Sequence, residues 1–264
     1  MLSPILEPVL FPMIHALHGN FGLPSDWEAA LPPGVPAKAW HLWEIRRHHP
    51  ETHTLTGFAT WFNSQIAALP PDPHRILAGY SLGGRLALHV LADRPALWHR
   101  ALIISAHPGL RTGVERATRL AHDLQWRKLC LDEPWDAVCA RWNAQPLFKA
   151  AEAVSMMQPS EAWRAEIASA FEGWSLSHQA GLPGWPPHQQ TQGYWLAGAL
   201  DTKFSALAKK ACSLWIGFEP RILEDASHRL LSEKPGALRE FIEVLLGKKQ
   251  KKDRTLPSGP PIIL

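Results

Sequence analysis

The 264-residue sequence contains only three cysteines, and no two of them form a CxxC pair. An odd number of widely spaced thiols argues against a disulfide framework or a zinc site and fits a reducing compartment, so we expect a cytoplasmic protein. No run approaches the roughly 18 consecutive apolar residues of a membrane span. The first basic residue is Lys38, which excludes a typical secretory signal. Metal-ligand spacings and Gly-rich phosphate loops are also missing, so we expect no metal and no organic cofactor.

The excess of positive charge lies at the C-terminus. The chain carries +3, but residues 248–254 alone contribute +4, which leaves −1 for the remainder. A basic tail can bind nucleic acid or a membrane surface, but a solvated chain end explains it without a partner. We therefore expect no nucleic-acid partner, and the sequence does not define the oligomeric state. With 46% apolar and 19% charged residues, the rest is typical of one large globular domain.

Short apolar runs alternate with amphipathic stretches along the chain. Strands are predicted at residues 13–17, 75–80, 101–106, 193–198 and 212–216. Continuous apolar strands separated by helices predict an α/β fold, with a mainly parallel sheet flanked by helices. Helical periodicity alone fills the stretch after the third strand, at residues 116–131, 135–144 and 162–171. We therefore expect a core at 1–110 and 191–247, a helical cap inserted at 111–190 over the carboxyl edge of the sheet, and a basic, Pro-rich tail at 248–264.

A nucleophile motif follows the strand predicted at residues 75–80. Gly79-Tyr80-Ser81-Leu82-Gly83 fits G-x-S-x-G and leads directly into a predicted helix. In such a strand–turn–helix the serine hydroxyl stands above the sheet, and backbone N–H groups at the helix start face a developing oxyanion. The motif predicts an α/β-hydrolase fold with Ser81 as the reactive serine.

An α/β-hydrolase also needs an acid and a histidine, in the order Ser…Asp/Glu…His. Asp201 follows the strand predicted at 193–198, and His228 follows the next one. Glu219 and Asp225 are alternatives for the acid, and His107 is an alternative for the histidine. His18-Gly19-Asn20 after the first strand fits the oxyanion loop, so the backbone N–H groups of Asn20 and Leu82 are expected to form the oxyanion hole.

Further motifs resemble one family within this fold. They are Gly79 to Arg85, Ser105-Ala106-His107-Pro108-Gly109-Leu110, Glu115-Arg116-Ala117-x-Arg119, Asp123-x-Gln125-Trp126, Arg141-Trp142-x-x-Gln145-Pro146-x-Phe148 and Asp201-x-Lys203-Phe204. Over about residues 14–240 the chain is similar to the MenH family, the 2-succinyl-6-hydroxy-2,4-cyclohexadiene-1-carboxylate (SHCHC) synthases. The last two motifs are the most specific, because generic esterases have no reason to keep them.

The resemblance implies a lyase of menaquinone (vitamin K2) biosynthesis. The family removes pyruvate from 2-succinyl-5-enolpyruvyl-6-hydroxy-3-cyclohexene-1-carboxylate (SEPHCHC) by proton abstraction and 2,5-elimination. By the family pattern, Ser81, His228 and Asp201 abstract the proton, and the oxyanion-hole N–H groups stabilise a substrate carbonyl. Matching positions that line the substrate site are Tyr80, Arg85, Arg119, Trp142 and Phe148.

The residues agree with a polycarboxylate substrate independently of the family. Arg85 lies one helical turn beyond Ser81, and Arg116 and Arg119 share one face of the first cap helix. Guanidinium groups bind carboxylates bidentately. The alternative for each arginine is ordinary solvated surface charge.

The sequence departs from the family at three places. The family's additional cap arginine has no counterpart, since Arg164 is the only arginine between Phe148 and Trp185 and does not align with it. The loop that follows the second sheet strand in the family has a different sequence here, at residues 43–50. Within it, Arg46 or Arg47 is a candidate replacement for the missing cap arginine. Ser227 stands where a glycine commonly precedes the histidine.

Three other functions remain open at this point. A carboxylesterase or C–C hydrolase would use the same serine to form an acyl-enzyme. A non-catalytic binding protein could keep the fold, although it would not need Ser81, Asp201 and His228 together. The basic tail could also serve a separate binding role.

Overall fold

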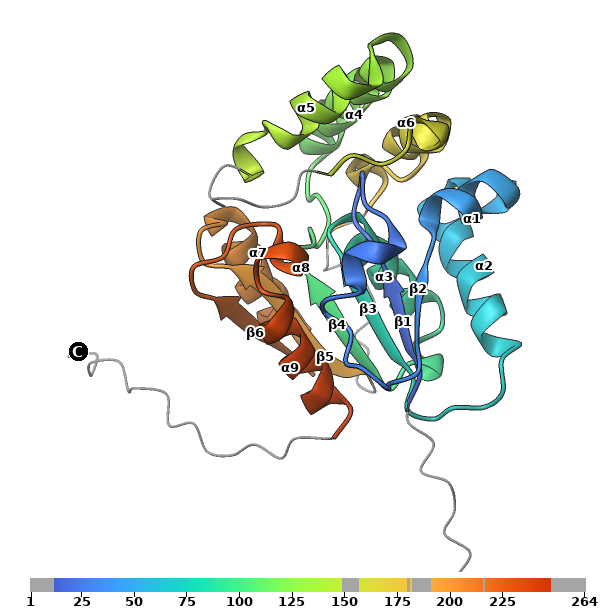
Figure 1. Cartoon of the computed structure of the whole chain (residues 1–264), viewed down its shortest axis with the longest axis vertical. Coiled ribbons are helices and arrows are strands. Elements are labelled where there is room, and N and C mark those ends of the chain that lie inside the picture. The colour runs from blue at the N-terminus through green and yellow to red at the C-terminus, as the bar shows by residue number, and fades with distance from the viewer. Residues whose placement is uncertain (1–11, 149–156, 180, 182–190, 216, 248–264) are drawn as a thin grey trace, which may run out of the picture.

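The computed structural model describes residues 12–148, 157–179, 181, 191–215 and 217–247. Six parallel strands form one sheet in the order β2-β1-β3-β4-β5-β6 (Figure 1). The strands are β1 (Ile14–Leu17), β2 (Ala37–Trp40), β3 (Ile76–Tyr80), β4 (Arg100–Ile104), β5 (Gln192–Gly198) and β6 (Phe218–Leu223). The predicted α/β fold with a parallel sheet is confirmed.

Helices cover both faces of the sheet, because the inner strands bury side chains on each side. Leu77 and Ile103 belong to one apolar cluster, whereas their neighbours Ile76 and Leu102 belong to another. The first cluster includes α1 (Leu42–His48), α2 (Leu55–Ala67), α3 (Leu82–Asp93) and α7 (Thr202–Leu214). The second includes η1 (Pro24–Trp27), α8 (Leu230–Glu233) and α9 (Pro235–Leu245). Two short 3-10 turns, η2 (Pro50–His53) and η3 (Pro95–Leu97), lie between α1 and α2 and between α3 and β4.

A group of helices separates β4 from β5 and lies over one edge of the sheet (Figure 1). It contains α4 (Gly113–Asp132), α5 (Trp135–Asn143), η4 (Pro146–Phe148), η5 (Glu161–Trp163), α6 (Arg164–Gly173) and η6 (Leu176–His178). Trp126 of α4 stacks on Phe171 of α6 with 6.0 Å between ring centroids. The helices predicted at 116–131, 135–144 and 162–171 therefore form, and the described part of this segment contains no strand.

Two predictions about the core were wrong. Residues 212–214, expected in a strand, belong to the last turn of α7, and the sixth strand is instead Phe218–Leu223. Of the loop expected at residues 43–50, residues 43–48 instead belong to α1 (Leu42–His48). In addition, β2 has no counterpart among the predicted strands. The tail at 248–264 lies outside the described residues, and no helix within them is long and apolar enough to span a membrane.

Candidate active site

Ser81 occupies a sharp turn between β3 and α3. Its φ of 52° and ψ of −108° lie in a region that non-glycine residues rarely adopt. The turn closes only because small residues surround it, since a Cβ on Gly79 would collide with the carbonyl of Gly83, and one on Gly83 with that of Leu17. The backbone N–H of Ser81 donates to Ile104 O at 2.8 Å. This geometry fits the nucleophile elbow predicted from the sequence.

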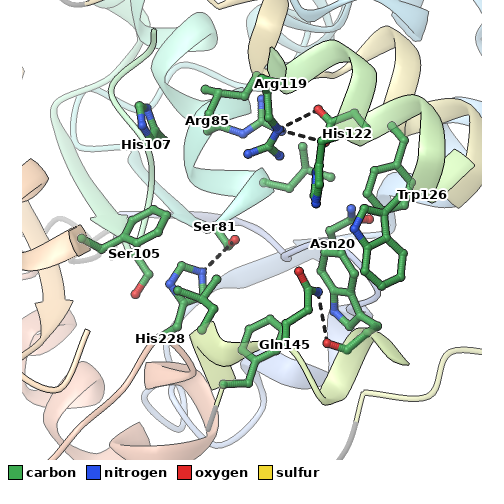
Figure 2. A pocket seen from close by; sticks show the side chains of 18 of the residues that line it. Asn20, Ser81, Arg85, Ser105, His107, Arg119, His122, Trp126, Gln145 and His228 are labelled. Carbon is green, nitrogen blue, oxygen red and sulfur yellow. Dashed lines mark hydrogen bonds and ion pairs between the residues drawn. The ribbon is translucent and has the colours of Figure 1, made fainter. Parts of the chain in front are cut away.

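Ser81, His228 and Asp201 form one chain of hydrogen bonds. His228 Nδ1 donates to Asp201 Oδ2 at 2.7 Å, and Ser81 Oγ lies 3.2 Å from His228 Nε2, which accepts from the hydroxyl (Figure 2). Asp201 and His228 are 7% and 2% exposed. The second Asp201 oxygen accepts from Phe204 N at 3.2 Å, at the start of α7. The carboxylate therefore fixes the imidazole tautomer that leaves Nε2 free to take the serine proton.

The sequence alternatives for these roles lie elsewhere. Glu219 is exposed on the edge strand β6 and contacts Arg221. Asp225 is exposed in the turn before His228, with a φ of 52°. His107 lines the same cavity as Ser81, but the imidazole bonded to Ser81 is that of His228.

A cavity of about 130 Å³ opens above Ser81, between the sheet edge and the overlying helices (Figure 2). Its wall includes Asn20 and Leu82 near the sheet edge, and Trp142 and Phe148 from the overlying helices α5 and η4. Leu82 is the first residue of α3, where a backbone N–H has no acceptor within the helix. The positions expected to provide the oxyanion hole thus lie beside the serine in this cavity.

Positive charge gathers in the cavity. Arg85, Arg119 and Lys203 line it, and Asp123 is the one carboxylate among the described lining residues. Asp123 is engaged from two sides, because Arg119 Nε donates to its two oxygens at 2.8 and 2.9 Å and Ser175 Oγ donates to it at 2.7 Å. Figure 2 shows Arg85 and Arg119 side by side, across the cavity from His228.

Arg85 is buried without a carboxylate partner among the described residues. It is 8% exposed, its Nη2 donates to Trp174 O at 2.8 Å, and its Nη1 has no hydrogen-bond partner there. Burial, reinforced by Arg119, lowers the pKa of the guanidinium to about 9, so it stays charged at neutral pH. A buried, incompletely bonded guanidinium is costly unless an anion reaches it. The cavity is therefore suited to a negatively charged ligand.

His107 adds a neutral donor to the same wall. Burial, followed by the nearby charges of Lys203, Arg85 and Arg119, lowers its pKa to about 3. Its Nδ1 accepts from Gly109 N at 3.1 Å, so the ring proton lies on Nε2. This imidazole is a hydrogen-bond donor, and at neutral pH it adds no charge to the cavity.

The matches to known proteins agree with this geometry. The alpha/beta hydrolase family model matches residues 16–241. The chain is 31% identical over 176 residues to the 2-succinyl-6-hydroxy-2,4-cyclohexadiene-1-carboxylate synthase of Escherichia coli O1:K1, covering 64% of this chain and 67% of the relative. It is 28% identical over 250 residues to the enzyme of the same name from Pectobacterium atrosepticum, covering 91% and 96%. The chain belongs to the MenH family of α/β hydrolases.

Solved structures show the same fold. MenH from S. aureus superposes with a TM-score of 0.69 at 16% identity, over 90% of this chain and 94% of that one. The carboxylesterase CesB from Bacillus subtilis gives 0.61 at 16% identity, over 92% and 86%. At such identities the likeness defines the fold, and substrate choice must come from the cavity.

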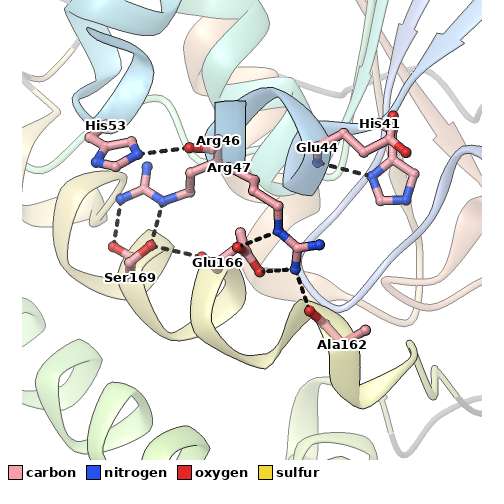
Figure 3. A network of polar contacts seen from close by, with 8 residues as sticks. All are labelled: His41, Glu44, Arg46, Arg47, His53, Ala162, Glu166 and Ser169. Carbon is pink, nitrogen blue, oxygen red and sulfur yellow. Dashed lines mark hydrogen bonds and ion pairs between the residues drawn. The ribbon is translucent and has the colours of Figure 1, made fainter. Parts of the chain in front are cut away.

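Two arginines considered as replacements for the MenH family's additional cap arginine have other contacts. Arg46 Nε and Nη2 donate to Ser169 Oγ and O at 2.7 and 2.8 Å (Figure 3). Arg47 binds both oxygens of Glu166, at 2.8 and 2.9 Å. Both arginines therefore join α1 to the cap helix α6, and neither lines the cavity.

Arg164 does not supply the missing charge either. It bonds Glu133 O and Glu161 on the outside of the cap, at 3.0 and 2.6 Å. Arg116 is likewise absent from the cavity wall. The other departure from MenH motifs, Ser227, has a local role, because its N–H and hydroxyl both donate to Glu233 and hold the loop that carries His228.

Tyr80 is the one expected substrate contact that the structure does not bring into the cavity. Its ring is 1% exposed, lies 5.9 Å from the His228 ring between centroids, and borders a second cavity instead. Tyr80 and Ser81 are adjacent in sequence, but Tyr80 still belongs to the strand and packs in the cluster under α8 and α9.

Several cavity residues had been given no role in the site from the sequence. Six of them belong to the family motifs, namely Ser105, Asp123, Trp126, Gln145, Lys203 and Phe204, whereas His122, Leu147, Phe171 and Leu176 do not. A role for Asp123 could have been inferred, since it lies four residues after Arg119 on one helix. Lys203 follows Asp201 by two residues at the start of α7, which places it at the same sheet edge. No group of three or more His, Cys, Asp or Glu side chains within the described ranges is arranged to hold a metal ion.

Proposed function

We propose that this MenH-family protein is a carbon–oxygen lyase that converts SEPHCHC to SHCHC and pyruvate in menaquinone biosynthesis. The observation that carries the proposal is the pairing of a reactive-serine geometry with the buried, carboxylate-free guanidinium of Arg85 in one cavity. The names of its relatives from E. coli and P. atrosepticum support the same reaction. Its three thiols are free, which fits a cytoplasmic enzyme.

The cavity chemistry supports a substrate with several carboxylates. Arg85 offers an unpaired Nη1, and Arg119 keeps its two terminal nitrogens available because only its Nε is bonded to Asp123. Lys203 adds a third positive charge. Trp142 and Phe148 provide apolar walls for a carbocyclic ring. We propose that residues 111–190 act as the cap that encloses this substrate.

The mechanism follows from the hydrogen-bond chain. Ser81 Oγ, with its proton drawn to His228 Nε2, removes a ring C–H proton of the substrate, and Asp201 stabilises the imidazolium that forms. The electron pair from the C–H bond builds negative charge on the adjacent carbonyl, which the N–H groups of Asn20 and Leu82 stabilise. The pair then shifts through the ring, and the C–O bond to the enolpyruvyl group breaks. The leaving group departs as the enolate of pyruvate and takes up the proton held by the His228 imidazolium, which gives pyruvate and restores the neutral imidazole. No acyl-enzyme forms.

The experiment that tests the function compares two substrates. We expect kcat/KM for SEPHCHC to exceed that for p-nitrophenyl acetate by at least 100-fold, and Arg85→Gln to lower only the SEPHCHC value, because the neutral ester needs no guanidinium. A carboxylesterase would show the opposite preference. Aryl-ester turnover above SEPHCHC turnover in the wild-type protein would overturn the proposal.

A further inference from the structure

A second cavity, of about 330 Å³, lies beside the candidate active site and shares none of its lining residues. It is lined by the chain neighbours of three residues of that site. Phe21 follows Asn20, Tyr80 precedes Ser81, and Arg229 follows His228. Its volume lies at the lower end of the range for small-molecule sites, about 300–1,000 Å³.

Arg229 is a buried, positively charged side chain in the wall of this cavity. It is 4% exposed, and its guanidinium lies 4.2 Å above the ring of Phe148, which lines the active-site cavity. It donates from Nη2 to Asn143 Oδ1, while its buried Nε has no partner among the described residues. Asn143 is itself fixed, since its Oδ1 accepts from Met157 N and its Nδ2 donates to Met157 O, at 3.0 and 2.9 Å.

No carboxylate of the described residues pairs with Arg229. Glu233 is taken by Ser227, which donates to both of its oxygens. Asp26, the one carboxylate among the described residues of the cavity wall, accepts from Leu23 N at 3.0 Å, and burial raises its pKa. Burial lowers the pKa of Arg229, and Tyr80 and Glu233 act in the opposite direction. Among the described residues, this guanidinium has one hydrogen bond, to a neutral amide, and one aromatic contact, with Phe148, so an anion that enters beside it would stabilise it further.

The remaining wall determines what kind of anion fits. It is mainly apolar, with Phe21, Leu23, Ala29, Met157, Pro159 and Leu231, and its neutral polar side chains are Tyr80, Gln158 and Ser232. A ligand there needs one negative group for Arg229 and an apolar body, whereas a polycarboxylate would leave its other charges without partners. We propose that the second cavity binds a small organic monocarboxylate with a short apolar chain, held by Arg229. This site does not depend on the reaction at Ser81.

The test titrates the full-length protein with hexanoate, followed by ligand-detected NMR. We expect saturable binding, and at least tenfold weaker binding of hexanamide, which has nearly the same shape without the charge. Arg229→Gln should weaken hexanoate binding at least tenfold. Ala29→Trp offers a second route, because Ala29 is exposed on the cavity wall and a large side chain there narrows the cavity without disturbing the core.

Arg85→Gln is the matched control, since Arg85 lines the other cavity. We expect its hexanoate affinity to stay within twofold of wild type. Hexanoate affinity that falls in Arg85→Gln as far as in Arg229→Gln would place the ligand in the active-site cavity and overturn the proposal. So would binding that is unsaturable, equal for hexanamide, or unchanged in both Arg229→Gln and Ala29→Trp.

Discussion

The backbone N–H of Arg85 donates to the carbonyl of Ser81 at 3.1 Å, which places a buried guanidinium one helical turn beyond the proposed base. The same helix start thus holds the serine, the proposed oxyanion-hole position at Leu82 and the proposed carboxylate-binding group of Arg85. An ester-hydrolysing enzyme needs the first two, and the third suits a charged substrate.

The arginine pair leads to a prediction about substrate capture. Arg85→Gln and Arg119→Gln should each lower kcat/KM for SEPHCHC at least tenfold, about 1.4 kcal/mol or more, because each removes a charge-assisted hydrogen bond. Arg116→Gln is the control, as it lies on the same helix outside the cavity. Steady-state kinetics that show equal values for Arg116→Gln and Arg119→Gln would contradict the assignment.

Asp201→Asn tests the imidazole tautomer. The amide N–H would donate to His228 Nδ1, so the ring proton would move to Nε2, and Nε2 could no longer accept from the Ser81 hydroxyl. We expect kcat to fall by about 10⁴. The fold should persist, since an asparagine oxygen can still accept from Phe204 N at the start of α7. Unchanged thermal unfolding with kcat within tenfold of wild type would show that Asp201 is dispensable.

Two wholly buried histidines predict acid sensitivity. Burial, reinforced by the charge of Arg75, lowers the pKa of His15 to about 4, and burial lowers that of His18 to about 3. His18 Nε2 accepts from Leu42 N at 3.1 Å, a bond that protonation would break. Because both values lie below the ordinary 6.5, the unfolded chain binds protons first as the pH falls. The stabilisation is present above pH 6.5 and is lost below it.

The size of this effect can be measured by urea unfolding. Between about pH 6 and 4.5, the free energy of unfolding should fall by up to about 2.7 kcal/mol per pH unit from these two groups. His89 and His107, whose pKa values burial lowers to about 4 and about 3, add to the slope of the whole protein, so His15→Leu should reduce that slope by up to about 1.4 kcal/mol per pH unit. It also removes the acceptor of Trp40 Nε1 at all pH values, which changes the intercept and leaves the slope as the test. The same slope in both proteins would refute the linkage.

Arg46 and Arg47 give a prediction about stability, because Arg46 is buried and Arg47 is exposed. Arg46→Met should destabilise by about 2 kcal/mol, because Arg46 is 3% exposed and loses two hydrogen bonds to Ser169. Arg47→Met should cost less, since Arg47 is exposed and its pair with Glu166 is screened by solvent. Urea unfolding of both variants decides the order, and a larger loss for Arg47→Met would contradict it.

The inner part of the sheet was predictable, whereas its edges were not. Strands β1, β3, β4 and β5 are buried on both faces and appear as continuous apolar runs. The two edge strands lack that pattern, since β2 exposes Ala37 and Lys38 and β6 contains Pro220. The apolar run at 212–216 looked like a strand because a short run cannot distinguish a strand from the end of a buried helix.

The candidate site was predictable where backbone position alone fixes it. Ser81, Asp201 and His228 follow strands that end at one edge, so their order along the chain was informative. Tyr80 lines the second cavity instead, because it packs in the apolar cluster under α8 and α9 although it adjoins Ser81 in sequence. The contacts of Arg46 and Arg47 with α6 depend on how α6 packs against α1, and no local sequence pattern predicts that packing.

The most direct test of the account supplies SEPHCHC, generated in situ, and follows SHCHC and pyruvate. The account predicts efficient formation of both products in equal amounts, and loss of nearly all turnover in a normally folded Ser81→Ala variant. Wild-type turnover in Ser81→Ala, or no conversion of SEPHCHC by the wild-type protein, would contradict it.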